Sequence, residues 1–323
     1  MNPKKEVLRA MLADFLIVTG QVVTLFLMMG AGYFFAKRGW LSDSAQAQMS
    51  HILLYLVAPC VILDSLTKAE CTPALLRSFG LCLVLTVAVY LLYILLAQPL
   101  FPRIPADTRN PLRFAVVYGN IGFMGLPLIQ SVLGAEALLF CTVVLAVFNI
   151  ITWTHGVLLM GGRDQLSLGK ALLNPGVIGC LAGLILFLTG AGLPSPVATA
   201  IDYLADLNTP LAMLVLGGQM AGARLADTFR PGPLYLVSLL RLVVLPALTA
   251  LLLLPFHQES LVYCTLVILS GCPTAGITGM FAQQFHRDAG AAAQAVTLST
   301  LLSIVTLPIL ATAARALAGS LLV

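Results

Sequence analysis

The feature that most constrains this chain is a series of ten apolar segments, each long enough to cross a lipid bilayer. Of the 323 residues, 59% are hydrophobic and only 9% are charged, whereas roughly 25% of a soluble domain is charged. In hydrocarbon, helices satisfy every backbone group within the segment. The sequence therefore predicts an all-α polytopic membrane protein with ten transmembrane helices. They are expected at about 13–36, 45–66, 73–98, 111–133, 136–160, 170–190, 196–221, 233–255, 260–284 and 290–318.

Basic residues in the turns predict the orientation of the chain. Ten Lys and Arg follow the odd-numbered segments, against three at the opposite side, and such residues concentrate on the cytoplasmic side. Both termini are therefore expected outside the cytoplasm, in the cell membrane (the inner membrane if the source is bacterial), although Lys4, Lys5 and Arg9 favour the reverse. The ten are Lys37, Arg38, Arg103, Arg109, Arg113, Arg163, Lys170, Arg224, Arg230 and Arg287, and the three are Lys68, Arg77 and Arg315.

The segment count predicts an internal repeat. Five segments precede the turn at Gly161–Lys170 and five follow it, so the two halves, 1–162 and 163–323, must cross the membrane in opposite directions. Such 5+5 inverted repeats are typical of secondary transporters. Matching prolines support the repeat, because Pro59 and Pro210 lie in segments 2 and 7, and Pro127 and Pro273 in segments 4 and 9.

Pro127 and Pro273 predict breaks in helices 4 and 9. Both are surrounded by glycines, at a depth where a helix in lipid should be regular. If new half-helices begin near these prolines, their positive ends converge, and free backbone N–H groups there can bind a carboxylate. The alternative is that both prolines make simple kinks. Asn120, Asn149 and Asn208 are either ligand contacts or polar contacts between helices, and Asn120 is the favoured ligand contact.

Two of these segments carry a family resemblance. Asn120-Ile-Gly-Phe-Met-Gly-Leu-Pro127 and Asn208-Thr-Pro-Leu-Ala-Met-Leu-Val-Leu-Gly217 resemble signature segments of the auxin efflux carrier family, which includes bacterial permeases of malonate and other organic acids. The resemblance implies a scaffold, at about 13–66 and 170–221, and a transport domain, at about 73–160 and 233–318, which moves like an elevator. It also implies crossing helices, a homodimer through the scaffold, and a carboxylate held by Asn120 and nearby backbone. The long cytoplasmic loop of the plant members is absent, which favours a small carboxylate over auxin.

The predicted substrate site combines both lines of reasoning. Its residues are Asn120, Ile121, Gly122, Gly125, Pro127, Asn149, Asn208, Cys272, Pro273, Thr274 and Gly276. No cofactor, metal or nucleic acid is expected, because the seven cysteines are scattered and no nucleophile has a base at catalytic spacing.

Charged residues within the apolar segments suggest an ion pathway. Asp64, Asp202 and Asp206 form either a proton or cation relay or an outer vestibule that is wetted by water. Arg241 either attracts an anion or extends to the interface. Whether transport is coupled to H⁺ or Na⁺ stays open.

A cation/proton antiporter is the alternative transporter, but it should carry a carboxylate at the crossing, where only Asn, Thr and Cys are expected. A channel or sensor is the alternative of another class.

Overall fold

The computed structural model of the chain describes residues 3–166, 169, 175–222, 228–229, 232–256 and 258–321. Within these residues, each of the ten predicted segments is a helix or a run of helices. Lys170, Arg224 and Arg230, used above to predict the orientation, lie outside them. The helices of the first half are α1 (Pro3–Lys37), α2 (Asp43–Ile52), η1 (Leu53–Val57), α3 (Ala58–Thr67), α4 (Pro73–Ala97), α5 (Ala106–Val117), η2 (Ile121–Gly125), α6 (Leu126–Leu133), η3 (Ala135–Ala137), α7 (Leu138–Ile151), η4 (Thr152–Gly156) and α8 (Val157–Gly161).

The second half also consists of helices with short interruptions. Its helices are η5 (Arg163–Gln165), α10 (Pro175–Thr189), α11 (Ser195–Asp206), α12 (Asn208–Gly222), α14 (Gly232–Leu239), η6 (Leu240–Val244), α15 (Leu245–Leu253), η7 (Leu254–Phe256), α16 (Ser260–Ser270), α17 (Ile277–Gln284) and α18 (Ala289–Leu321). The elements η1, η4 and η6 are single π-helical turns inside longer helical runs, and η2 is the first turn of the helical run that α6 continues.

Six of the described helical runs are long and apolar enough to cross a membrane. Three apolar helices are shorter, Ile121–Leu133, Val177–Thr189 and Ser260–Ser270, and two of them flank the interruptions in segments 4 and 9. The chain is therefore a multi-pass membrane protein, with six candidate spans in the part that the structure describes. They are Phe15–Lys37, Asp43–Thr67, Pro73–Ala97, Ala135–Gly161, Gly232–Phe256 and Ala289–Gly319.

Local sequence signals explain where the helices begin. Ser42 accepts a hydrogen bond from the Ala45 amide at the start of α2, and Thr72 accepts one from Leu75 at the start of α4. Both are N-cap residues, and Pro73 follows Thr72 in the first turn, where its missing N–H leaves no helical bond unmade. The residues at which α2 and α4 begin are therefore determined by N-cap side chains as well as by the change from a polar turn to an apolar segment.

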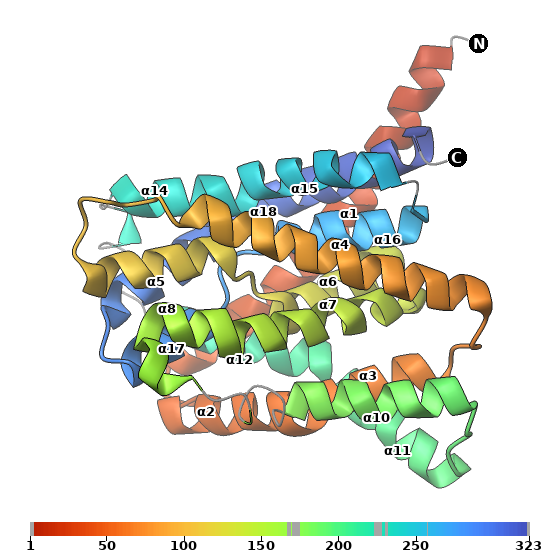
Figure 1. Cartoon of the computed structure of the whole chain (residues 1–323), viewed down its shortest axis with the longest axis horizontal. Coiled ribbons are helices and arrows are strands. Elements are labelled where there is room, and N and C mark those ends of the chain that lie inside the picture. The colour runs from red at the N-terminus through yellow and green to blue at the C-terminus, as the bar shows by residue number, and fades with distance from the viewer. Residues whose placement is uncertain are drawn as a thin grey trace.

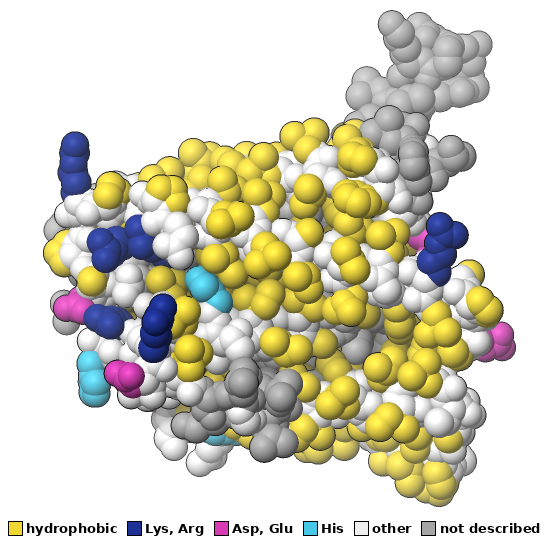
Figure 2. All heavy atoms as spheres, viewed as in Figure 1, with side chains coloured by type: hydrophobic (Ala, Val, Ile, Leu, Met, Phe, Trp, Pro, Cys, Tyr) yellow, Lys and Arg dark blue, Asp and Glu magenta, His cyan; other side chains and the backbone are white. Residues whose placement is uncertain are grey.

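The helices lie side by side along the long axis of the molecule, and α1 begins and α18 ends at the same end (Figure 1). The most extensive packing joins α1 to α12 and α18, α3 to α10 and α11, α4 to α7, α15 to α16, and α18 also to α5, α14, α16 and α17. Figure 2 shows hydrophobic side chains over the middle of the visible face and most of its lysines and arginines at one end, where α5 begins and α8 ends. This distribution matches a lipid-facing belt with one basic side.

Candidate functional site

The two interruptions meet inside the molecule. Residues 118–120 separate α5 from η2, and residues 271–276 separate α16 from α17. The Asn120 amide donates to the Pro273 carbonyl at 2.7 Å, and the Ala275 amide donates to the Tyr118 carbonyl at 2.9 Å. These bonds make an antiparallel bridge between Gly119 and Thr274. We call this bridged pair of segments, residues 118–122 and 271–277, the crossing.

Pro127 does not mark the break, and this corrects the sequence-based interpretation. It is the second residue of α6, which continues from η2 without interruption. The helix instead begins at Ile121, with Asn120 as its N-cap. The π-helical turn of η2 lies directly before the proline, and such a turn accommodates a local irregularity without ending the helix. Pro273, by contrast, lies within the break and accepts the bond from Asn120.

The two breaks lie further apart along the chain than the two prolines. Pro127 and Pro273 are 146 residues apart, but the bridged residues Gly119 and Thr274 are 274 − 119 = 155 apart. The first helical residues after the breaks, Ile121 and Ile277, give 277 − 121 = 156. The separation of the two breaks thus differs from that of the two prolines, and the correspondence of the two halves stays a prediction.

Backbone amides at the crossing remain available for a ligand. The N–H groups of Gly122, Gly276 and Ile277 have no hydrogen-bond partner among the described residues. All three residues are half-buried, although most of their neighbours in the crossing are buried. A side chain at Gly122 would meet nothing within 4 Å, so there is open space beside it. Free N–H groups at helix N-termini form an anion site without a charged side chain.

Asn120 adds a side-chain donor to these amides. Its Oδ1 accepts from the Phe123 amide at 3.3 Å, which caps the half-helix that begins at Ile121. Its Nδ2 has no partner among the described residues, although the residue is only 5% exposed. A buried amide donor without a partner costs roughly 1–3 kcal/mol, and a bound acceptor would remove that cost.

Arg241 lies at the crossing, where the sequence predicted no charged side chain. It is only 1% exposed, so it does not extend to the interface. Nε donates to the Cys272 carbonyl at 2.8 Å, and Nη1 donates to the carbonyls of Val116 and Val117 at 3.3 and 3.1 Å. Its guanidinium also lies over the ring of Tyr93, with Cζ 5.7 Å from the centroid. Arg241 thus binds the C-terminal carbonyls of α5 and the break that follows α16.

The charge of Arg241 gives the crossing a positive sign. Two helix C-termini and two helix N-termini meet there, each worth roughly half a charge of opposite sign, so their contributions cancel. Among the described residues no carboxylate pairs with Arg241. The guanidinium therefore leaves the crossing with a net charge of about +1.

Comparison with known proteins gives the class of this chain. A family profile described as Membrane transport protein matches residues 17–169 and again residues 165–311. The chain belongs to this family, that of the auxin efflux carriers. It is a membrane transporter and not an enzyme. The match in two halves suggests a repeat.

Three relatives cover nearly the whole transporter. A protein of Rhizobium meliloti named "Putative malonate transporter" is 26% identical over 300 residues, which are 90% of this chain and 93% of that protein. An uncharacterised transporter of Methanocaldococcus jannaschii is 24% identical over 293 residues, 88% of this chain and 94% of the relative. One from Methanothermobacter thermautotrophicus is 24% identical over 297 residues, 90% and 96% of the two chains.

Other residues predicted for the transporter's site have packing roles at the crossing. Thr274 donates through Oγ1 to the Ala115 carbonyl, and its amide donates to Ser299 Oγ. A Cβ on Gly125 would lie 2.7 Å from Leu269 Cδ2, so this glycine permits close contact with α16. Ile121 and Cys272 are buried. Their predicted part in substrate binding stays a prediction.

The structure separates the roles of the other two asparagines. Asn149 donates through Nδ2 to the Leu145 carbonyl in its own helix at 2.9 Å, so its donor is partly used. Asn208 begins α12, is 3% exposed, and has an unpaired Nδ2 among the described residues. Helix α12 packs against η2, where the half-helix of the crossing begins. Asn208 thus has a free donor in a helix adjacent to the crossing.

Two of the three carboxylates of the predicted ion pathway pair with a lysine. Lys68 Nζ lies 2.8 Å from Asp64 and 2.8 Å from Asp202, which joins α3 to α11. Hydrogen bonds to Asp202 and Asp64 raise the pKa of Lys68. Asp206, one turn after Asp202, is exposed and has no ion pair among the described residues. A relay through these groups stays a prediction.

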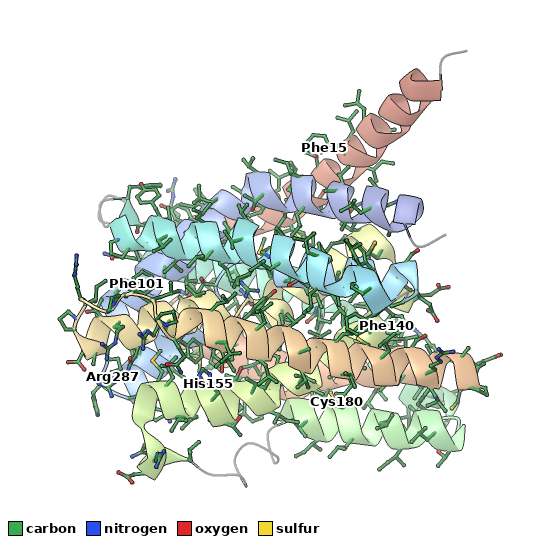
Figure 3. The ribbon with its side chains drawn as sticks, turned by 45° about the horizontal axis from the view of Figure 1, so that its top comes forward. Phe15, Phe101, Phe140, His155, Cys180 and Arg287 are labelled. Carbon is green, nitrogen blue, oxygen red and sulfur yellow. The ribbon has the colours of Figure 1, made fainter. Side chains whose placement is uncertain are left out.

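Sequence reasoning missed a second polar contact at the break. Tyr118 donates its hydroxyl to the Ile151 carbonyl at 3.1 Å, and the same hydroxyl lies 2.8 Å from His155 Nδ1. Figure 3 labels His155, which lies in η4. The only signal in the sequence was an ionisable ring inside an apolar segment.

Proposed function

We propose that this membrane transporter is a secondary transporter for a small organic anion that carries a carboxylate. The observation that carries the proposal is the set of unpaired donors at a positively charged crossing, namely the amides of Gly122, Gly276 and Ile277 with Asn120 Nδ2. A carboxylate offers only acceptors, and its bonds to such donors are charge-assisted and short.

The helix contacts support a 5+5 inverted repeat of ten transmembrane helices, divided at residues 162 and 163. If segments 1 to 5 correspond to segments 6 to 10, the packing of α1 on α12 has its counterpart in the packing of α10 on α3. The packing of α1 on α18 likewise corresponds to that of α10 on α7. The bridge at the crossing joins segments 4 and 9, which correspond to each other. Ten spans put both termini on one side of the membrane, and the basic residues in the turns after the odd-numbered segments place that side outside the cytoplasm.

The same contacts support two domains. The scaffold comprises α1, α2, α3, α10, α11 and α12, and the transport domain comprises the helices from α4 to α8 and from α14 to α18. The proposed substrate site lies where α12 packs on η2, at the boundary between them. A carboxylate bound there would move with the crossing as the transport domain slides along the scaffold, which is elevator-type alternating access. A homodimer formed through the scaffold would keep the scaffold fixed in the membrane while the transport domain moves.

A cation/proton antiporter fits the crossing less well. A cation site needs oxygen ligands and a compensating negative charge. The described residues of the crossing contain no carboxylate, and Arg241 would repel a cation at this depth. The positive charge thus favours an anion as the transported species.

The name of the Rhizobium meliloti relative makes malonate the first compound to test. The inside-negative membrane potential favours export of an anion by roughly 2.3 kcal/mol per charge per 100 mV. Export therefore needs no coupling ion, whereas accumulation would require H⁺ or Na⁺. Transport by reconstituted protein with and without imposed H⁺ and Na⁺ gradients separates these modes.

Asn120→Ala tests the proposed site. We expect binding of the transported carboxylate to weaken by about tenfold, because one donor to a charged group is lost. A thermal-shift screen of small carboxylates first identifies the ligand, and its binding and uptake into proteoliposomes are then compared between variants.

Asn149→Ala is the matched control, because its amide already donates within α7. It should have a smaller effect than Asn120→Ala. Normal binding by the Asn120 variant, or a screen in which no carboxylate binds, would refute the assignment.

A further inference from the structure

A histidine and a tyrosine join the last part of segment 5 to the crossing. His155 lies in the π-helical turn η4, and its Nδ1 is 2.8 Å from the hydroxyl of Tyr118. Tyr118 is the first residue of the crossing, and its carbonyl accepts a bond of the bridge from the Ala275 amide at 2.9 Å. A titratable side chain inside a membrane-spanning segment is a candidate functional group, and here its hydrogen-bond partner belongs to the crossing.

The hydroxyl of Tyr118 has a second acceptor, which lets this contact hold an extra proton. It lies 3.1 Å from the carbonyl oxygen of Ile151. While the imidazole of His155 is neutral with its proton on Nε2, Nδ1 accepts the phenol proton. Once Nδ1 is protonated, it donates to the phenol oxygen, and the phenol proton turns to the Ile151 carbonyl. The Nδ1 and hydroxyl protons thus have an acceptor in both states, so uptake of a proton leaves no donor of this contact unpaired.

The charged groups near His155 make no ion pair with it in the part of the chain that the structure describes. Its π-helical turn packs against α7 and α8, and ring contacts add α5 and α17. The titratable groups on or directly after these elements are Cys141 on α7, Asp107, Arg109 and Arg113 on α5, Tyr118 after α5, and His286 and Arg287 after α17. Arg287 is paired with Asp107, and His286 is exposed. Because an imidazole ordinarily titrates between pH 5 and 8, a change of charge inside this region over that range comes from His155.

His155 lies close to one end of its helical run. The side chain is half-buried, and it is 161 − 155 = 6 residues before Gly161, where α8 ends. At 1.5 Å per residue this is about 9 Å along the helix. The position gives a proton a short path from the basic side of the molecule, where α8 ends (Figure 2).

We propose that His155 is a proton-binding site that couples H⁺ to transport of the carboxylate, with one proton carried for each substrate. The proposal rests on the proposed function. His155 lies in the transport domain, so a proton bound there crosses the membrane together with the substrate at the crossing. The imidazolium adds its positive charge to that of Arg241 and therefore strengthens binding of an anion. By linkage, the bound anion strengthens binding of the proton to the same degree.

The pH dependence of carboxylate binding to the purified protein tests the proposal. The probe is malonate or, if malonate does not bind, the tightest carboxylate of the thermal-shift screen. We expect its dissociation constant to be about tenfold lower at pH 6 than at pH 8, a common size for coupling between two sites. In proteoliposomes, a pH gradient that is alkaline inside should drive accumulation of the same compound.

Three variants locate the proton. His155→Asn keeps an acceptor for Tyr118 but takes up no proton, so its dissociation constant should stay near the pH 8 value of the original protein at both pH values. Tyr118→Phe removes the hydroxyl that accepts from protonated Nδ1, so the pH dependence should remain but move to lower pH. His286→Asn is the control, because it makes the same substitution at an exposed histidine of the transport domain. Its positive φ of 53° is one that asparagine tolerates.

The outcomes separate this proposal from the proposed function. Tighter binding at pH 6 and gradient-driven accumulation that are both lost in His155→Asn but kept in His286→Asn support the proton site. If the original protein and His155→Asn bind the carboxylate with the same pH dependence, the proton site is wrong and the carboxylate site still stands. If no carboxylate binds to any of the proteins, both proposals are wrong.

Discussion

Replacing Arg241 with methionine is expected to lower carboxylate uptake by at least about a hundredfold. The variant removes the charge that makes the crossing positive, and it leaves the carbonyls of Val116, Val117 and Cys272 without their donors. Leaving a buried carbonyl without its donor costs roughly 1–3 kcal/mol for each carbonyl. Initial uptake rates in proteoliposomes measure the effect.

Arg241→Lys separates the charge from the hydrogen bonds. Lysine keeps the positive charge but cannot reproduce the planar guanidinium that reaches both breaks. We expect uptake by Arg241→Lys to be at least about tenfold faster than uptake by Arg241→Met. Its thermal stability should still be below that of the original protein. If the lysine and methionine variants transport equally poorly and are equally unstable, Arg241 is structural and its charge does not act on the substrate.

Replacing Gly217 with alanine is expected to lower the thermal unfolding temperature by about 5–10 °C. A Cβ at this position would lie 1.9 Å from the Met29 carbonyl oxygen and 2.7 Å from the Tyr33 amide nitrogen, both backbone atoms of α1. Gly32 on α1 has the reciprocal contact, 2.2 Å from the Leu214 carbonyl oxygen. Backbones cannot yield as side chains do, so α1 and α12 must separate, at a cost of roughly 1–3 kcal/mol or more.

Gly222→Ala is the control for this prediction. It lies on the same helix, and its Cβ would meet nothing within 4 Å. Alanine is the better helix former, so the unfolding temperature should stay the same or rise slightly. Equal losses in the two variants would show that the effect comes from helix propensity and not from the contact between α1 and α12.

Hydrophobic patterning predicted the helical segments because a spanning helix must be apolar along its length. It did not place the start of the half-helix in segment 4, which depends on the Asn120 cap and on the π-helical turn before Pro127. A π-helical turn leaves no mark in composition or periodicity. Pro127 therefore identified the segment that contains the break, but not the residue at which the half-helix begins.

The candidate site was predictable in part for a similar reason. Asn120 could be singled out because a mid-membrane amide is unusual. The depth of Arg241 was also readable, but whether it turned inward or toward the interface depended on packing. Lys68 pairs with Asp64 at helical spacing, whereas its bond to Asp202 spans 134 residues and needed the fold. Which backbone amides stay free at the crossing follows only from its hydrogen bonds.

A structure with a transported carboxylate bound tests the central claim most directly. We expect the carboxylate at the crossing, with its oxygens within about 3 Å of the Gly122 and Ile277 amides and of Asn120 Nδ2, at ordinary hydrogen-bond distance. Density for the ligand at another place, for example beside Asp64 and Lys68, with the crossing empty, would contradict the account.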